Sequence, residues 1–219
     1  MKPFEVSQPL TSLLDSYPNA HLVVDVAKNG GKTSKEAIAR LWLSEGIPFA
    51  FKTKPALYEV LRSWLGNKLD VDPKEIHLSG SARIGQSLAP YKIGTDFGEH
   101  SDLDLFVVSF ELFSRVEADF NKWSSQFEAG LVQPRNDREK GFWEDNNRRG
   151  KGTINRGFID SKMIPNRTNY PSNQNIAQSM WELKKKLDAT EHAPRVKSAS
   201  IRCYKNWKSY VQQMVISLG

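Results

Sequence analysis

Hydrophobic residues recur along this chain with characteristic spacings, and each spacing predicts one kind of element. Between residues 54 and 69, apolar side chains are three or four positions apart, the spacing of an amphipathic helix packed on a sheet. The same spacing predicts helices over residues 34–44, 111–129, 176–187 and 197–218. Helices are therefore expected to flank whatever sheet the remaining apolar segments form.

Short apolar runs predict the strands, which are expected at residues 21–26, 76–78, 103–109 and 153–160. The stretches between these elements are polar or rich in glycine and proline, and they are predicted to be loops. The longest such stretches are residues 87–98, 130–140 and 165–175. Strands mixed with helices in this order indicate the α+β class.

Two carboxylates stand at the start of the predicted strand 103–109. Asp102 and Asp104 are two positions apart, so in a strand they project from the same face. Two carboxylates at such a short distance repel each other, and a divalent cation between them relieves the repulsion. The predicted strand 76–78 runs into Gly80 and Ser81, a small-residue turn that lets a phosphate approach the backbone. A phosphate-binding turn beside two aspartates that can bind a metal ion is typical of enzymes that transfer phosphoryl or nucleotidyl groups.

Gly80-Ser81, followed after a spacer by Asp102-Leu103-Asp104, resembles the signature of the DNA polymerase beta-like nucleotidyltransferase superfamily. The resemblance extends over about residues 54–109, and the helix directly before the Gly-Ser strand is in the order that the superfamily uses. The spacer is longer than in the most compact members, because residues 87–98 look like an inserted loop. Stand-alone prokaryotic relatives, some from defence-associated loci, carry similarly long spacers.

The resemblance implies a small mixed β-sheet nucleotidyltransferase core flanked by helices, with further helices at the C-terminus. On this basis the chain divides into a lead-in (1–52), the core (53–165) and a C-terminal helical segment (166–219). It further implies that NMP passes from an NTP to a hydroxyl acceptor, with release of pyrophosphate, and that two Mg²⁺ or Mn²⁺ ions assist.

The superfamily pattern also assigns roles to individual residues of this chain. Gly80, Ser81 and Arg83 are expected at the nucleotide phosphates, and Asp102 and Asp104 at the metal ions. A third carboxylate from a later strand completes such a site. Asp160 is the candidate, with Glu144 and Asp145 as alternatives, because no motif fixes the register of the strand that carries it.

Charge and composition add information about partners. The formal net charge of +6 favours polyanionic partners, although a basic surface also serves solubility alone. On the predicted helix 197–218, Arg202, Lys205 and Lys208 share a stripe that either contacts nucleic acid or is simply solvated. The single cysteine, Cys203, excludes an internal disulfide and fits a reducing cytosol. No apolar run is long enough to cross a membrane, which predicts a soluble, cytoplasmic protein without a membrane partner.

Two functional hypotheses remain open from the sequence. The first is an active nucleotidyltransferase whose acceptor is an RNA 3′ end, a second nucleotide, a protein side chain or a small alcohol. A toxin or immune-signalling role follows from the defence-locus relatives by analogy. The second is a catalytically inactive module of the same fold that binds a protein or nucleic acid partner, as an antitoxin does. A Walker-type NTPase is excluded, because Val26 occupies the position five residues before Gly31 where that motif needs glycine.

Overall fold

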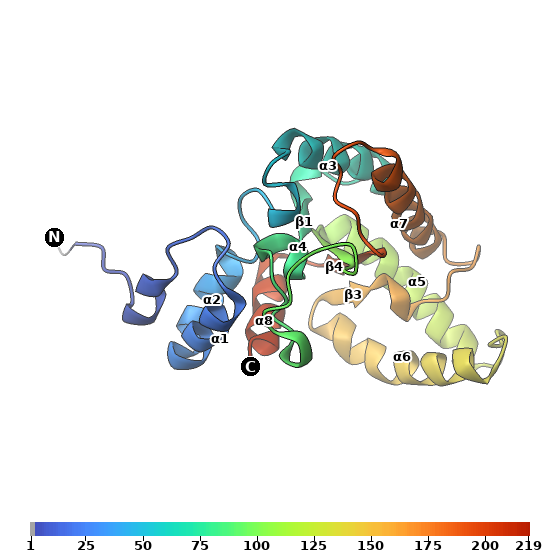
Figure 1. Ribbon diagram of the computed structural model, residues 1–219. Helices are drawn as coiled ribbons and strands as arrows, with labels where there is room; N and C mark the ends of the chain where they lie inside the picture. The colour runs from blue at the N-terminus through green and yellow to red at the C-terminus, as the bar shows by residue number, and fades with distance from the viewer. Residues whose placement is uncertain (1–2) are drawn as a thin grey trace.

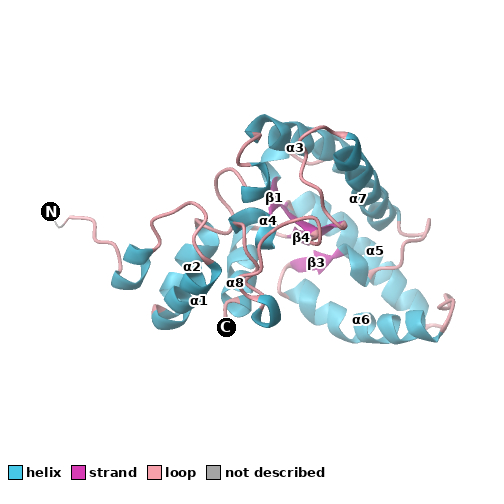
Figure 2. Cartoon of the chain, in the orientation of Figure 1, coloured by secondary structure: helices cyan, strands magenta, loops and turns pink. Residues whose placement is uncertain are grey.

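The computed structural model describes residues 3–219 and shows an α+β fold built on a four-stranded mixed sheet. Figures 1 and 2 show helices on both sides of this small sheet. The elements in chain order are α1 (Ala20–Asn29), α2 (Gly31–Arg40), α3 (Pro55–Leu69), β1 (Ile76–Leu78), α4 (Gly80–Ile84), β2 (Leu103–Val108), α5 (Phe110–Glu128), α6 (Asp137–Asn155), β3 (Phe158–Asp160), α7 (Pro171–Ala189), β4 (Ala199–Tyr204) and α8 (Trp207–Ser217). The predicted fold class, a small mixed sheet flanked by helices, is confirmed.

The strands lie in the order β1-β2-β4-β3. Strand β1 is antiparallel to β2, with His77 opposite Phe106. Strand β4 is parallel to β2, with Asp104 opposite Ser200, and β3 is antiparallel to β4, with Asp160 opposite Arg202. This order places β4, from the last part of the chain, between the strands that carry Asp104 and Asp160.

One face of the sheet is covered by α3, α5 and α7 and forms the main hydrophobic core. Leu103, Leu105 and Val107 point to this side from β2, as the alternation of a strand requires. Because side chains alternate along a strand, the even-numbered residues of β2 face the other side of the sheet.

Pro55 stands in the first turn of α3, where its missing N–H costs nothing, as the sequence predicts.

The second face is covered at one end only, by α8. Phe106 and Tyr204 of the sheet pack there against Tyr210 of α8 in a buried aromatic cluster. The ring centroids of Phe106 and Tyr210 are 4.3 Å apart and the rings are stacked. Asp102 and Asp104 lie toward the other end of this face, and both side chains are exposed.

The predicted strand 21–26 is wrong, because these residues form helix α1. Val23, Val26 and Ala27 are buried at helical spacing against α2, and the Asn19 side chain caps the helix by accepting a hydrogen bond from the N–H of His21. A four-to-six-residue apolar run does not distinguish a strand from a buried helical turn. The packing of α1 against α2 therefore favours the helix over the strand.

Two predictions in the second half of the chain are also wrong. Residues 137–155 are one helix, α6, rather than a loop followed by a strand, and the strand is limited to Phe158–Asp160. Asn136 caps α6 by accepting a hydrogen bond from the Glu139 N–H, while Glu139 binds the N–H of Arg135. The predicted final helix 197–218 is strand β4 followed by the shorter helix α8, so the segment 166–219 supplies a central strand of the sheet.

Within residues 3–219, no helix combines the length and the hydropathy that a membrane crossing needs.

His77 makes the stability of this fold sensitive to acid. Its ring stacks on Phe106 with centroids 5.0 Å apart, and its Nδ1 lies 3.2 Å from the carbonyl oxygen of Ser44. Burial lowers the pKa of His77 to about 4, and Arg62 and Arg83 nearby add to the lowering. The imidazole is therefore neutral in the folded protein at pH values where an unfolded chain protonates it.

We expect the free energy of unfolding to fall as the pH drops below the ordinary His pKa of about 6.5, and to stop falling near pH 4. At about pH 5 the contribution of His77 to this loss is about 2 kcal/mol. Urea unfolding at about pH 7 and pH 5 measures the loss, which His77→Gln removes and which the exposed His100→Gln control keeps. Equal pH dependence in all three proteins would contradict the assignment.

Candidate active site

The turn after β1 lies directly beside Asp104 of β2. The backbone N–H of Ser79 donates a 2.8 Å hydrogen bond to the carbonyl oxygen of Asp104, and the Ser79 hydroxyl lies 3.3 Å from the same oxygen. Gly80 has a φ of +60°, a conformation that other residues rarely adopt, and a Cβ added there would lie 3.7 Å from Oδ2 of Asp104. Ser81 follows in the first turn of α4 and is partly buried. The turn therefore contacts the backbone of Asp104 across the two strands and lies beside its carboxylate.

Asp102 and Asp104 each accept a hydrogen bond from a serine at, or directly before, the start of the neighbouring strand β4. The Ser198 hydroxyl donates to Oδ1 of Asp102 at 2.7 Å, and the Ser200 hydroxyl donates to Oδ1 of Asp104 at 2.6 Å. These short, charge-assisted bonds fix the orientation of both carboxylates and leave each with a second oxygen. Both side chains are exposed, so a ligand can reach those oxygens.

Asp160 lies on the same face but two strands away from β2. Its Oδ1 accepts a hydrogen bond from the N–H of Lys162, and its Oδ2 lies 3.4 Å from Nη2 of Arg202. Strand β4, which carries Ser200 and directly follows Ser198, occupies the place next to β2. Asp160 therefore faces Arg202 and does not join Asp102 and Asp104 in one carboxylate cluster. Of the alternatives, Asp145 pairs with Arg148 and Arg149 along α6, and Glu144 is on the same helix.

Two adjoining recesses surround these groups. A cavity of about 310 Å³ is lined by Asp104, Asp160 and Arg202, together with Tyr210 of α8. The second recess, of about 430 Å³, lies on the other side of Ser200 and Lys162, which line both. It contains Lys184, Lys197 and the indole of Trp181, which is 59% exposed. Basic side chains and an exposed aromatic ring therefore lie beside the carboxylates.

The prediction that Arg83 meets phosphate oxygens is not supported by its position. Its side chain is only 4% exposed, and Nη1 donates a 3.1 Å hydrogen bond to the carbonyl oxygen of Ile47. Burial lowers the pKa of the guanidinium from its ordinary value. Gly85, at the end of α4, packs against the ring of Phe49, so this side of α4 faces protein. Arg83 joins α4 to the segment before α3.

Arg83→Met is expected to lower the free energy of unfolding by about 1–3 kcal/mol, because the buried guanidinium's hydrogen bond to the carbonyl oxygen of Ile47 is lost and only the Tyr17 hydroxyl still donates to that oxygen. Urea unfolding measures the loss, and Arg148→Met, on the exposed face of α6, serves as the matched control with little change. If Arg83 held phosphate instead, Arg83→Met would leave stability unchanged and weaken nucleotide binding.

The predicted basic stripe on one helix does not exist, because its members belong to three different segments. Arg202 is on β4 and lies over the ring of Phe158. Lys205 is in the turn after β4 and lies 5.6 Å from the centroid of Phe110. Lys208 is in the first turn of α8 and lines a separate cleft on the far side of that helix.

The carboxylates suit a hard divalent cation. Mg²⁺ and Mn²⁺ take oxygen ligands, and Mg²⁺ is commonly held by one or two carboxylates with substrate phosphates and water as the remaining ligands. The free oxygens of Asp102 and Asp104 match that donor set for one ion. Across residues 3–219, no three His, Cys, Asp or Glu side chains lie close enough together to hold a metal ion. In the described part of the chain, no third carboxylate therefore lies beside Asp102 and Asp104 to hold the second ion that the sequence predicts.

Sequence analysis missed Ser198, Ser200 and Lys162 as neighbours of the carboxylates. The signal for the serines was present, since Ser198, Ser200 and Arg202 alternate with apolar residues in the period of a strand. Comparison of this chain with protein-family models, with curated proteins and with solved structures finds no match in any of the three.

Proposed function

We propose that this chain is a metal-dependent nucleotidyltransferase, which transfers NMP from an NTP to a hydroxyl acceptor and releases pyrophosphate. The observation that carries the proposal is the contact of the Ser79-Gly80 turn with Asp104, next to a second exposed carboxylate on the same strand face. Two exposed like charges held together by structure are unfavourable without a cation, so the pair favours a metal-dependent role.

In the proposed reaction the residues of the site have separate roles. Asp102 and Asp104 would hold Mg²⁺ or Mn²⁺ through the oxygens that Ser198 and Ser200 leave free. The bound ion neutralises triphosphate charge and stabilises the charge that develops during transfer. Lys162 and Lys197 favour the approach of the triphosphate from the adjoining recess, whose third lysine, Lys184, is paired with Asp188. Gly80 keeps the backbone beside Asp104 open to a phosphate, because it carries no side chain there.

The substrate and acceptor follow from the same surroundings. Trp181 offers an exposed ring on which a nucleobase stacks, within reach of the three lysines of the recess. The acceptor we propose is an RNA 3′ end or a second nucleotide, in line with the net positive charge of the chain. Asp160 contributes by holding Arg202 at the wall of the carboxylate cavity.

Incubation of the purified protein with each NTP, labelled at the α-phosphate, in Mg²⁺ or Mn²⁺, tests the proposal. Total RNA is added to one half of the reactions, and products are separated by size. We expect label in RNA or in a small oligonucleotide, and no label with the variant that combines Asp102→Ala and Asp104→Ala. A variant with the same charge change at the exposed residues Glu5 and Asp25 is expected to keep the activity.

The alternative function is a catalytically inactive module that binds a protein or nucleic acid partner. The observation that favours it is the ion pair of Asp160 with Arg202, which leaves Asp102 and Asp104 without a third carboxylate. Thermal unfolding separates the two hypotheses, because an active site should be stabilised by NTP only when Mg²⁺ is present. Lack of stabilisation by any NTP, with no label transferred, would favour the inactive module.

A further inference from the structure

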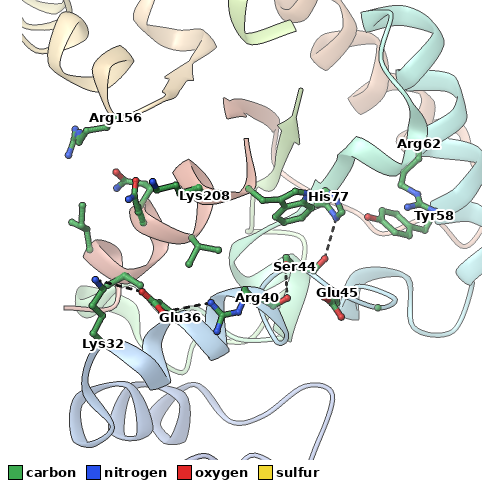
Figure 3. Close-up of a pocket in the computed structure, with 17 residues that line it drawn as sticks. Lys32, Glu36, Arg40, Ser44, Glu45, Tyr58, Arg62, His77, Arg156 and Lys208 are labelled. Atoms are coloured by element: carbon green, nitrogen blue, oxygen red, sulfur yellow. Dashed lines mark hydrogen bonds and ion pairs between the residues drawn. The ribbon is translucent and has the colours of Figure 1, made fainter. Parts of the chain in front are cut away.

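A cleft of about 1160 Å³ shares no lining residue with the carboxylate cavity. Helix α8 separates the two: Tyr210 and Met214 face the carboxylate cavity, while Trp207 and Val211 face the cleft. The other walls come from α2, from the first turns of α3, from β1 and from the end of α6. Figure 3 shows this cleft, with Lys208 between Arg156 and the side chains of α2 in this view.

The cleft carries an excess of positive charge. Its lining contains five basic side chains and only two carboxylates, Glu36 and Glu45; the basic residues are Lys32, Arg40, Arg62, Arg156 and Lys208. Glu36 is shared by Lys32 at 3.9 Å and Arg40 at 3.8 Å, both long for an ion pair. Arg156 and Lys208 are exposed and form no ion pair with any residue in 3–219. A polyanion is therefore the ligand that the charges favour.

Aromatic and unpaired polar groups lie among these charges. The indole of Trp207 is 44% exposed and contacts the neutral ring of His77 at a centroid distance of 5.0 Å. Arg62 and Gln213 also line the cleft, and Nε of Arg62 and Oε1 of Gln213 lie buried behind its surface without a hydrogen-bond partner in the described part of the chain. A ligand that combines phosphates with a flat ring would complement the basic side chains and the exposed indole.

We propose that this cleft binds single-stranded nucleic acid, with the phosphates on the basic side chains and a base against Trp207. Grooves that bind single strands combine positive charge along the backbone path with aromatic rings that stack bases. The strand must be single, because the bases of a duplex are already stacked on each other and cannot reach a ring in a cleft. The volume exceeds the roughly 300–1,000 Å³ typical of small-molecule pockets, which favours several nucleotides over one.

The test is fluorescence anisotropy of a labelled single-stranded oligonucleotide of about twelve nucleotides, without NTP or metal. The variant with Arg156→Gln and Lys208→Gln is expected to bind about tenfold more weakly, and its salt dependence should be shallower by about 0.7 per lost phosphate contact. Trp207→Leu is expected to weaken binding by roughly fivefold or more, and Trp207→Tyr to restore part of it. Circular dichroism and thermal unfolding verify that each variant is folded.

The matched control combines Lys185→Gln and Lys186→Gln, which remove the same charge from exposed positions on α7, across the sheet. This control should bind as the unaltered protein does, and because neither NTP nor metal is added, the cleft is tested independently of nucleotidyl transfer. Cleft variants that bind normally would overturn the proposal. Tighter binding of the matching duplex, or equal competition by ATP or by poly-glutamate at the same charge concentration, would also overturn it.

Discussion

Asp104→Asn is expected to reduce nucleotidyl transfer by about 10²–10⁴-fold, corresponding to the several kcal/mol that a metal-held charge supplies in the transition state. The substitution removes one negative charge but keeps the shape of the side chain, and the amide oxygen still accepts the hydrogen bond from Ser200. Initial rates of label transfer from the preferred NTP, at several Mg²⁺ concentrations, measure the loss.

Stability distinguishes a functional role of Asp104 from a structural one. The repulsion between Asp102 and Asp104 falls when one charge is removed, so Asp104→Asn should unfold at the same or a higher urea concentration without metal. A folded variant that keeps full activity would contradict the proposed function. A variant that loses activity only because it unfolds would point to a structural role for the carboxylate.

Asp160→Asn provides the comparison within the same cavity. Because Asp160 faces Arg202 and is separated from β2 by β4, we expect this change to cost less than about tenfold in rate. A loss equal to that of Asp104→Asn would show that Arg202 releases Asp160 during the reaction, as a third metal-binding carboxylate requires.

The elements that the sequence predicts correctly are those whose local pattern agrees with their tertiary partners. The predicted strands 76–78 and 103–109 are β1 and β2, and they pair antiparallel so that the turn at Gly80 reaches Asp104. Helix α3 shows the predicted apolar spacing and its proline at the start. In these segments the apolar period is unambiguous and no competing pattern exists.

The errors arise where a distant contact decides the structure. Residues 199–204 fit helical spacing through Ile201 and Tyr204, but their polar and apolar residues also alternate as in a strand. They form a strand because they pair with the otherwise open edge of β2. Arg83 is similar, because nothing within its own segment reveals that its guanidinium binds the carbonyl oxygen of Ile47. Placing Asp160 two strands from Asp104 required the position of β4, which local pattern alone does not give.

Phe106→Ala is expected to lower the free energy of unfolding by about 3–5 kcal/mol, the largest stability effect that we predict. Phe106 is 1% exposed and lies between the rings of His77 and Tyr210, so its removal leaves a cavity where α8 meets the sheet. Tyr210 also joins α8 to the turn after α2, since its hydroxyl donates to the carbonyl oxygen of Leu43 at 3.0 Å.

The matched control is Phe110→Ala, which removes the same side chain from a position that is 56% exposed, and it is expected to cost less than about 1 kcal/mol. Urea unfolding at about pH 7, where His77 is neutral, measures both variants. A loss below about 1 kcal/mol for Phe106→Ala would mean that α8 does not depend on this cluster for its position. Because α8 forms one wall of the carboxylate cavity and one wall of the basic cleft, a large loss would show that a single aromatic contact maintains both.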